Sequence, residues 1–393
     1  MKALQFGLGI VLLVAIEILR VYYIMPFPGS QRSETLEFAY FIDQYIWYLR
    51  TMGFLLIIFP VWYFVQFGGR ASKWTVGLSL VLVVVVIYLF NFRFLADKMF
   101  LEPENKVFRK AADNAIPLQR LVLGITINGE SSAYPIELIG YHHQVRDSVG
   151  GEPVMITYCT VCRTGRAFSP VVDGKAEIFR LVGMDHFNAM FEDASTKSWW
   201  RQVNGEAVAG PLKGHFLKAL PSEQMSLSAW IRRHPDTRIM QADSTFSKAY
   251  AEIKLYYEGR SKGDLTRRDS LSWNDKSWVV GVQHNGMARA YDWNDLIAFR
   301  VLNDTLGGSA LLVALEADSV SFHVWQRDTL DFGLDLVSGD LIDQQTRSHW
   351  NWEGVCTDGP LAGRTLPAIQ SYQEFWHSWK TFRPGTTRFT TGP

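Results

Sequence analysis

The chain has 393 residues, and its 39 basic and 39 acidic side chains give a formal net charge of zero. This balance gives no support for a nucleic-acid partner, because proteins that bind nucleic acids carry an excess of Lys and Arg. Three cysteines are too few for the disulfide framework of a small secreted protein, and an odd number cannot all pair within one chain.

Three apolar runs in the first quarter of the chain predict membrane-spanning helices. They cover residues 3–25, 51–67 and 76–94. Each is close to the ~20 residues that a helix needs to cross the hydrocarbon core of a bilayer. The first run has no small-residue cleavage site after it, which favours an uncleaved anchor over a signal peptide. The sequence therefore predicts a multi-pass protein with a lipid bilayer as its partner.

Charged residues near these runs give two further expectations. Glu17 and Arg20 lie one helical turn apart and are expected either to pair or to extend towards the headgroups. An odd number of spans puts the N-terminus and the C-terminal body on opposite sides. The positive-inside rule does not orient them, because the flanking basic residues nearly balance: Lys2, Arg70 and Lys73 against Arg20, Arg32 and Arg50.

The rest of the chain contains an internal duplication. Residues 128–134 match 285–291, and 146–151 match 303–308 at the same offset. Further matches follow in the same order: 196–200 with 346–350, 210–214 with 359–363, and Trp230 and Pro235 with Trp379 and Pro384. We therefore divide the chain into an anchor at 1–100, a first repeat at 101–257, a linker at 258–279 and a second repeat at 280–393.

Turn and strand patterns within each copy predict a β-rich α+β body. An Asn-Gly pair precedes an Ala-Tyr strand in both copies, which is typical of a β-hairpin. Helical patterns are short and local, at 135–143 and 226–233, where Ser226 or Ser228 is suited to cap the start. The predicted fold class is a transmembrane segment of three helices plus a β-rich α+β soluble body built from the duplication.

A C-x-x-C motif follows the predicted strand at 154–158. In the second copy, Glu316 stands opposite Cys159 and Ser319 opposite Cys162. The adjacent histidines His142 and His143 likewise have no histidine counterpart in the second copy. Because the sister copy forms without these residues, the comparison favours function over packing for the motif.

These motifs resemble the domain-of-unknown-function family numbered 3179, a bacterial and archaeal group whose activity is not established. The resemblance covers the whole body through four motifs: Tyr158-Cys-x-x-Cys, Ser198-Trp-Trp, Gly210-Pro-Leu-x-Gly and His234-Pro-Asp-Thr. Segments 25–31 and 96–100 are similar to those of a membrane-anchored subgroup. The resemblance implies an extracytoplasmic, periplasmic body, and it places the family's usual histidine at His142.

The first hypothesis for the motif is a metal site. Two thiolates at C-x-x-C spacing with a following glycine can hold one ion, with histidines completing the shell. The predicted ligands are Cys159, Cys162 and His142, completed by His143 or His186. Thiolate and imidazole suit zinc or copper, and Met184 beside His186 would favour copper.

Two alternatives stay open. One is a thiol–disulfide oxidoreductase in which Cys159 attacks and Cys162 resolves. Its thioredoxin-like form is disfavoured, because Gly165 and Pro170 oppose a helix after the motif. The other is a non-enzymatic binding or assembly module, in which the cysteines only pack or form a local disulfide. No G-x-S-x-G elbow or phosphate-binding glycine loop is present, so the sequence does not decide whether the protein is an enzyme.

Overall fold

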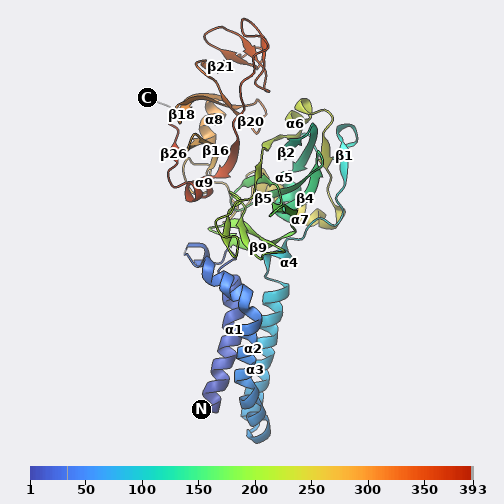
Figure 1. The fold of residues 1–393 in the computed structure, drawn as a ribbon, viewed down its shortest axis with the longest axis vertical. Helices are drawn as coiled ribbons and strands as arrows, with labels where there is room; N and C mark the ends of the chain where they lie inside the picture. The colour runs from blue at the N-terminus through green and yellow to red at the C-terminus, as the bar shows by residue number, and fades with distance from the viewer. Residues whose placement is uncertain (33, 391–393) are drawn as a thin grey trace. The chain divides into compact units, whose positions relative to one another are not determined.

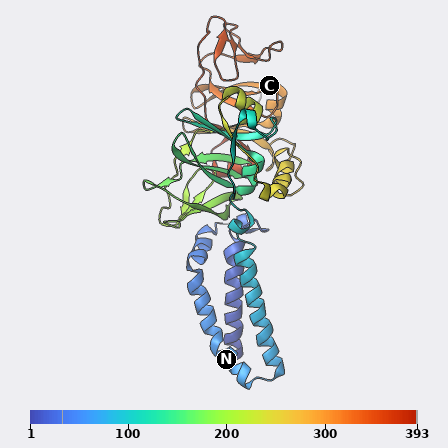
Figure 2. The ribbon, with the colours of Figure 1, turned by 90° about the vertical axis from the view of Figure 1, so that its right-hand side faces the viewer.

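The computed structural model describes residues 1–32 and 34–390, so the last three residues of the predicted second repeat, 391–393, lie outside the described part. Three long helices dominate the N-terminal part: α1 (Lys2–Tyr22), α2 (Leu36–Phe67) and α3 (Arg70–Phe92). They run side by side in both ribbon views (Figure 1, Figure 2). Each is long and apolar enough to cross a membrane, which confirms the three predicted spans.

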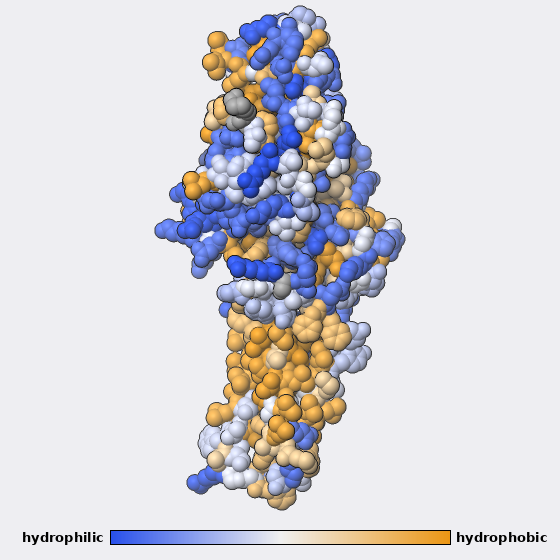
Figure 3. All heavy atoms as spheres, turned by 90° about the vertical axis from the view of Figure 1, so that its left-hand side faces the viewer, coloured by the Kyte–Doolittle hydropathy of each residue, from blue (hydrophilic) through white to orange (hydrophobic). Residues whose placement is uncertain are grey.

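The outer surface of these helices is suited to lipid. Apolar side chains cover most of the helical part in a space-filling view (Figure 3). Trp47, Trp62 and Trp74 are all exposed, as interfacial aromatic residues are in membrane proteins. The helix α2 begins at Leu36, well before the apolar run predicted from residue 51, so only its later part is uniformly apolar.

By its internal contacts the described chain forms two compact units. The first unit joins the N-terminal helices, including the short α4 (Ala96–Met99), to the segments Glu177–Arg201 and Glu206–Phe216 of the first repeat. These segments form an antiparallel sheet of order β12-β11-β10-β9, with bounds β9 (Phe179–Asp185), β10 (Asn188–Asp193), β11 (Trp199–Arg201) and β12 (Ala207–Ala209).

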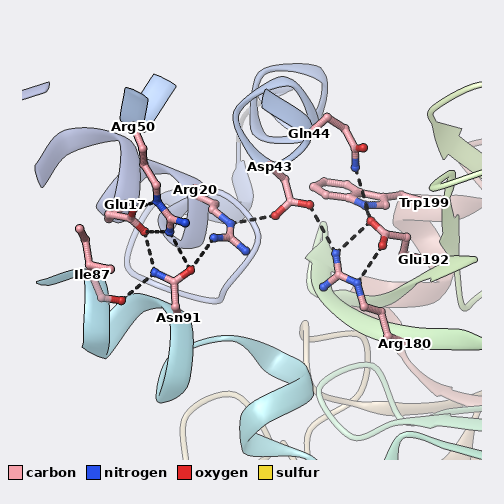
Figure 4. A network of polar contacts seen from close by, with 10 residues as sticks. All are labelled: Glu17, Arg20, Asp43, Gln44, Arg50, Ile87, Asn91, Arg180, Glu192 and Trp199. Atoms are coloured by element: carbon pink, nitrogen blue, oxygen red, sulfur yellow. Dashed lines mark hydrogen bonds and ion pairs between the residues drawn. The ribbon is translucent and has the colours of Figure 1, made fainter. Parts of the chain in front are cut away.

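A buried polar network crosses the helices of the first unit (Figure 4). Glu17 of α1 is 0 % exposed and binds Arg50 of α2 through two contacts, of 2.5 and 2.9 Å. Asn91 of α3 donates to Glu17 at 2.9 Å and accepts from Arg20 at 2.9 Å. Arg20 in turn binds Asp43 of α2 at 2.8 Å. The predicted pairing of Glu17 with Arg20 is therefore replaced by pairs between helices, because α2 brings an opposite charge to each.

The network continues from the helices into the small sheet of the same unit. Arg180 on β9 lies 3.4 Å from Asp43 and binds Glu192 on β10 through contacts of 2.8 and 2.9 Å. The indole N–H of Trp199 donates to Glu192 at 3.0 Å, and Gln44 reaches the same carboxylate. Charged side chains thus join α2 to the β9–β12 sheet (Figure 4).

The second unit contains two sheets of the first repeat, in the orders β1-β15-β3-β2-β14 and β13-β6-β5-β4. Their strands are β1 (Phe108–Lys110), β2 (Leu121–Ile127), β3 (Glu130–Pro135), β4 (Gln144–Val149), β5 (Glu152–Cys159), β6 (Thr164–Phe168), β13 (Ala219–Leu220), β14 (Glu223–Ser226) and β15 (Arg238–Met240). Beside them are the hairpin β7 (Val171–Val172) and β8 (Lys175–Ala176) and the helices α5 (Ile136–His142), α6 (Leu227–Arg233) and α7 (Ser247–Tyr257). The helices α5 and α6 were predicted, and of the two candidate caps of α6 the structure uses Ser226. The helix α7 was not predicted.

The second repeat keeps the strand orders of the first, but its sheets lack counterparts of β1 and β13. Its sheets have the orders β25-β16-β17-β26, β18-β19-β20 and β21-β22-β23-β24. The strands are β16 (Trp278–His284), β17 (Met287–Asp292), β18 (Val301–Leu306), β19 (Ser309–Leu315), β20 (Phe322–Gln326), β21 (Phe332–Leu334), β22 (Leu341–Asp343), β23 (His349–Trp350), β24 (Cys356–Asp358), β25 (Ser371–Phe375) and β26 (Thr387–Arg388), and the helices are α8 (Trp293–Phe299) and α9 (Trp376–Phe382). The β-rich body behind three helices confirms the predicted fold class.

Equivalent packing details recur in the two copies. A Cβ added at Gly124 would meet the Trp230 ring at 2.4 Å, and one added at Gly281 would meet the Trp379 ring at 2.1 Å. Each glycine therefore makes room for the large aromatic side chain of the following helix, α6 or α9. Both copies also turn their first hairpin through Asn-Gly, where the asparagine at the turn, Asn128 or Asn285, has a positive φ.

Candidate functional site

The C-x-x-C motif spans the turn between β5 and β6. Cys159 is the last residue of β5, and Cys162 lies in the turn two residues before β6 begins. Both side chains are 0 % exposed thiols and hydrogen-bond each other. A strand follows the motif instead of a helix, as Gly165 and Pro170 had predicted.

Groups from the linker and the second repeat surround this turn. Lys276, just before β16, donates from Nζ to the Val161 carbonyl at 2.8 Å. His377 on α9 lies with Nε2 3.1 Å from the same carbonyl and 3.2 Å from the lysine nitrogen. The neighbouring Ser378, whose hydroxyl donates to Glu374 at 2.9 Å, also lowers the pKa of the Cys162 thiol. Two thiols, an amine, an imidazole and a hydroxyl therefore meet at one place.

Burial controls the protonation of this cluster. It raises the pKa of Cys162 well above its usual value, and the adjacent Cys159 raises it further, while Ser378 and Lys276 lower it. Burial also lowers the pKa of Lys276 to about 8, against the opposing effect of the two cysteines. At neutral pH Cys162 is therefore a thiol, and it lies beside an ammonium group that readily loses its proton.

The imidazole of His377 is neutral under the same conditions. Burial, followed by the positive charge of Lys276, lowers its pKa to about 4. A neutral ring can accept a hydrogen bond from the Lys276 ammonium through Nε2. It can also donate through that nitrogen to the Val161 carbonyl when it carries the proton there, so the ring suits both protonation states of the lysine.

The two copies contact each other reciprocally around a pseudo-twofold arrangement. Gln224 on β14 and Gln373 on β25 pair with equivalent residues of β2 and β16, and their side chains hydrogen-bond each other at 2.8 Å. The Phe375 N–H donates to the Cys162 carbonyl at 2.9 Å, while Ser226, its equivalent, donates its N–H to Ser321 at 3.0 Å. Each copy's turn thus faces the strand and helix of the other.

This symmetry defines a second, equivalent position with different chemistry. The strand registers put Glu316 and Ser319 in the places of the two cysteines. Gln119, Ser228 and Ala229 take the places of Lys276, His377 and Ser378. None of the five side chains of the cysteine cluster is repeated there.

The acid at the second position has two side-chain partners. Glu316 binds His323 at 2.8 Å and Arg232 of α6 at 2.6 Å. A carboxylate held by Arg232 of the first copy and by the His323 ring of its own copy stabilises the contact between the copies and leaves no thiol chemistry there. The cysteine cluster is thus the chemically distinct member of the pair.

The histidines predicted as metal ligands have other partners. His142 Nε2 lies 2.7 Å from the Tyr250 hydroxyl, and His143 Nδ1 lies 3.0 Å from the Tyr141 carbonyl. Burial lowers the pKa of His143 to about 4. In the first unit, His186 contacts Asp185 at 2.6 Å, and this hydrogen bond raises the pKa of His186.

The structure therefore brings together the two predicted cysteines but joins them to residues that were not predicted. Within residues 1–32 and 34–390, no group of three or more His, Cys, Asp or Glu side chains is arranged to hold a metal ion. The zinc or copper ion, with Met184 as a soft ligand, stays a prediction from the sequence. Lys276, His377 and Ser378 were missed, although extending the match of Trp230 with Trp379 sets His377 against Ser228.

Comparison with known proteins identifies a family but no activity. A family model described as "Protein of unknown function (DUF3179)" matches residues 103–386, which include both copies and the cysteine cluster. Searches of curated proteins and of solved structures found no match.

Proposed function

The chain belongs to the DUF3179 family of proteins of unknown function, and we propose that it is a membrane-anchored protein whose Cys159–Cys162 pair undergoes reversible thiol–disulfide exchange. One observation carries this proposal. Of two equivalent positions created by the duplication, one holds two thiols with an amine and an imidazole, and the other has a different residue at each of the five equivalent places and no thiol. If these side chains served only to pack, the five residues would not all need to differ from those at the equivalent position of the other copy.

The chemistry begins with a proton transfer. The neutral form of Lys276 accepts a thiol proton, giving a thiolate beside an ammonium group, and the charge of the ammonium favours the thiolate. The thiolate attacks a sulfur of a small disulfide RSSR and expels RS⁻. The second cysteine then attacks the mixed disulfide and expels the other RS⁻. The two protons released by the cysteines give two RSH, so one disulfide is reduced as Cys159–Cys162 is oxidised.

Burial of both sulfurs sets a condition on this exchange. The segment 258–277, which has no helix or strand, reaches the cysteine turn through Lys276, whose Nζ also donates to the Leu265 carbonyl at 2.5 Å. Opening of this segment would expose the turn to a small disulfide. We therefore expect slow exchange in the folded protein and fast exchange once the segment is displaced.

Counting thiols in redox buffers tests the proposal. The full-length protein in detergent, equilibrated across a series of dithiothreitol ratios and then alkylated, should change between three and one reactive thiols by mass, with a single midpoint. Cys356→Ser is the matched control, because Cys356 is buried in a different core cluster and its loss should leave the two-thiol transition intact. Cys159→Ser should abolish the transition. Three thiols at every ratio in the wild type would refute the proposal.

Elemental analysis of the same samples separates this function from the predicted metal site. Protein prepared without chelator should contain no stoichiometric zinc or copper. One equivalent of metal, lost in both Cys159→Ser and His142→Ala, would instead support the site predicted from the sequence.

We also place the body outside the cytoplasm. The family resemblance supports this side, and an oxidising compartment is where a cysteine pair of this kind can cycle. A protease added to cells with a permeabilised outer envelope and an intact inner membrane should digest the body. Protection until the inner membrane is disrupted would contradict the placement.

A further inference from the structure

A large cavity lies within the second unit, between the two copies. Its volume is about 820 Å³. Residues of both copies and of the linker line it, including Arg163, Ser226, Arg268, Trp278, Asn294 and Gln373. This volume is in the range of small-molecule sites. Arg163 directly follows Cys162, but neither cysteine lines the cavity, so its ligand and the thiol chemistry are separate questions.

Two guanidinium groups lie against one aromatic ring in this cavity. The Cζ atoms of Arg163 and Arg268 are 3.7 and 4.1 Å from the centre of the Trp278 ring. Arg163 is 1 % exposed, so its charge is held inside the protein. Its Nε donates to the neutral Gln373 side chain at 2.9 Å. The cavity therefore has a cationic wall built on a rigid aromatic surface.

Negative charge offsets this wall only in part among the residues that the structure describes: Asp292 raises the pKa of Arg268 but forms no ion pair with it. Neither Arg163 nor Arg268 forms an ion pair there, and the two acids that line the cavity are engaged elsewhere. Glu258 pairs with Arg120 and Arg260, and Asp318 accepts from Ser321. Burial, followed by repulsion from Arg163, lowers the pKa of Arg268. Arg163 is fully buried and Arg268 partly buried, and two such like charges without an ion pair are costly unless something else neutralises them.

The same three side chains carry hydrogen-bond donors without acceptors. In the described part of the chain, Arg163 Nη1, Arg268 Nε and Trp278 Nε1 are buried and have no hydrogen-bond partner. All three belong to residues that line the cavity. Buried donors are satisfied in nearly all native proteins, so donors of one kind gathered at one cavity indicate an acceptor that enters it.

We propose that this cavity binds a small organic oxyanion, whose carboxylate or phosphate oxygens accept hydrogen bonds from Arg163, Arg268 and Trp278. Guanidinium groups match these oxyanions in shape and charge, which distinguishes them from a spherical chloride ion. Apolar side chains on the remaining wall, such as Leu121, Trp293 and Ile297, suit an uncharged body behind the acidic group. The site joins the two copies through one ligand.

Thermal unfolding of the full-length protein in detergent tests the site with two probes, benzoate and inorganic phosphate. Each is titrated against sodium chloride of equal ionic strength. At least one probe should raise the Tm in a saturable way, and the one that does so identifies the carboxylate or phosphate class. Cys159→Ser should respond like the wild type, so failure of the thiol proposal would leave this result unchanged.

Charge-matched variants locate the binding. Arg268→Gln should raise the half-saturating concentration on the order of tenfold or more, because a charged donor is lost. Arg267→Gln removes the same charge from an exposed neighbour that does not line the cavity, and it should behave like the wild type. The proposal is overturned if neither probe exceeds the effect of chloride, or if Arg268→Gln and Arg267→Gln respond equally.

Discussion

The two small sheets, β9–β12 and β21–β24, each contain a turn of the same type. They differ in the side chains around that turn. Asp193 accepts hydrogen bonds from the N–H groups of Thr196 and Ser198 and from the Trp200 indole. Asp343 accepts from the equivalent donors of Thr346, Ser348 and Trp350. Residues that form the turn are thus kept in both copies.

The side chains next to this turn are not kept. The strand registers set Arg180 and Glu192 of the first sheet against Gly333 and Ile342 of the second, and Trp199 against His349. In the first copy these residues bind the helix α2. The cysteine cluster follows the same rule, since it too occurs in one copy only. Shared residues therefore maintain the fold, and residues found in one copy form contacts specific to that copy.

The largest effect should come from the shared turn. Asp193→Ala or Asp343→Ala removes one acceptor for several buried donors, so each should lower the free energy of unfolding by about 3 kcal/mol or more. Thermal unfolding followed by tryptophan fluorescence measures this. Asp236→Ala, at an exposed position, should change little. A neutral Asp343→Ala would break the claim that the turn is structural in both copies.

A pH-dependent effect should follow from His377, a residue of one copy only. Its pKa is about 4 when folded and ~6.5 when unfolded, so between these values the unfolded chain binds more protons. Stability from this group is full above pH ~6.5 and falls as the pH drops to 4, by up to about 3 kcal/mol.

His377→Ser, which restores the residue type of Ser228, should remove this part of the acid sensitivity. Urea unfolding at pH 7 and pH 4.5 measures the difference. His215→Ser, at an exposed position, is the control. It should lose as much unfolding free energy between pH 7 and pH 4.5 as the wild type does. An equal loss of unfolding free energy between the two pH values in His377→Ser and the wild type would contradict a buried neutral imidazole.

A smaller effect should come from exchanging a contact residue between the copies. Glu192→Ile installs the residue of the second copy and leaves Arg180 and the Trp199 indole without their acceptor, at a cost of about 2 kcal/mol. Hydrogen exchange should rise in the first half of α2 and in β10, and stay unchanged in β22. Glu152→Ile, at an exposed strand position, is the control. Unchanged exchange in α2 would show that the ion pairs do not hold the sheet to the helix.

The smallest effect concerns reactivity instead of stability. Lys276→Gln installs the residue type of Gln119 and removes the cation that lowers the pKa of Cys162. Alkylation of the cysteine pair at mildly alkaline pH should slow on the order of tenfold. Lys380→Gln, exposed and paired with Asp275, should alkylate at the wild-type rate. An unchanged rate in Lys276→Gln would remove the lysine from the cluster.

Much of the fold could be predicted because its signals are local. Apolar runs, Asn-Gly turns and a serine cap each act over a few residues, and the duplication reports each of them twice. The helix α7 was missed because it has no counterpart in the second copy. The partners of Glu17 and Arg20 were also missed, since Arg50, Asp43 and Asn91 come from other helices.

The sequence predicted the two cysteines of the candidate cluster but not the residues that the structure places around them. Comparing the copies singled out Cys159 and Cys162, which lie together in the structure, but the histidines chosen to complete the site were those nearest in sequence. The residues that surround the cysteines follow them by more than a hundred positions and approach only through contact between the copies. Such contacts cannot be predicted from closeness in sequence. A residue that differs between equivalent positions of the two copies, such as Ser228 and His377, does point to them.

The hydrogen bond between Gln224 and Gln373 has a consequence for how the asymmetry arose. Equivalent residues touch each other in an isologous dimer, where one surface pairs with its own copy. In a dimer of identical chains both sites must change together, because one gene encodes them. Fusing the two copies into a single chain removes that constraint, so one site can hold a pair of thiols while its partner becomes an ion pair.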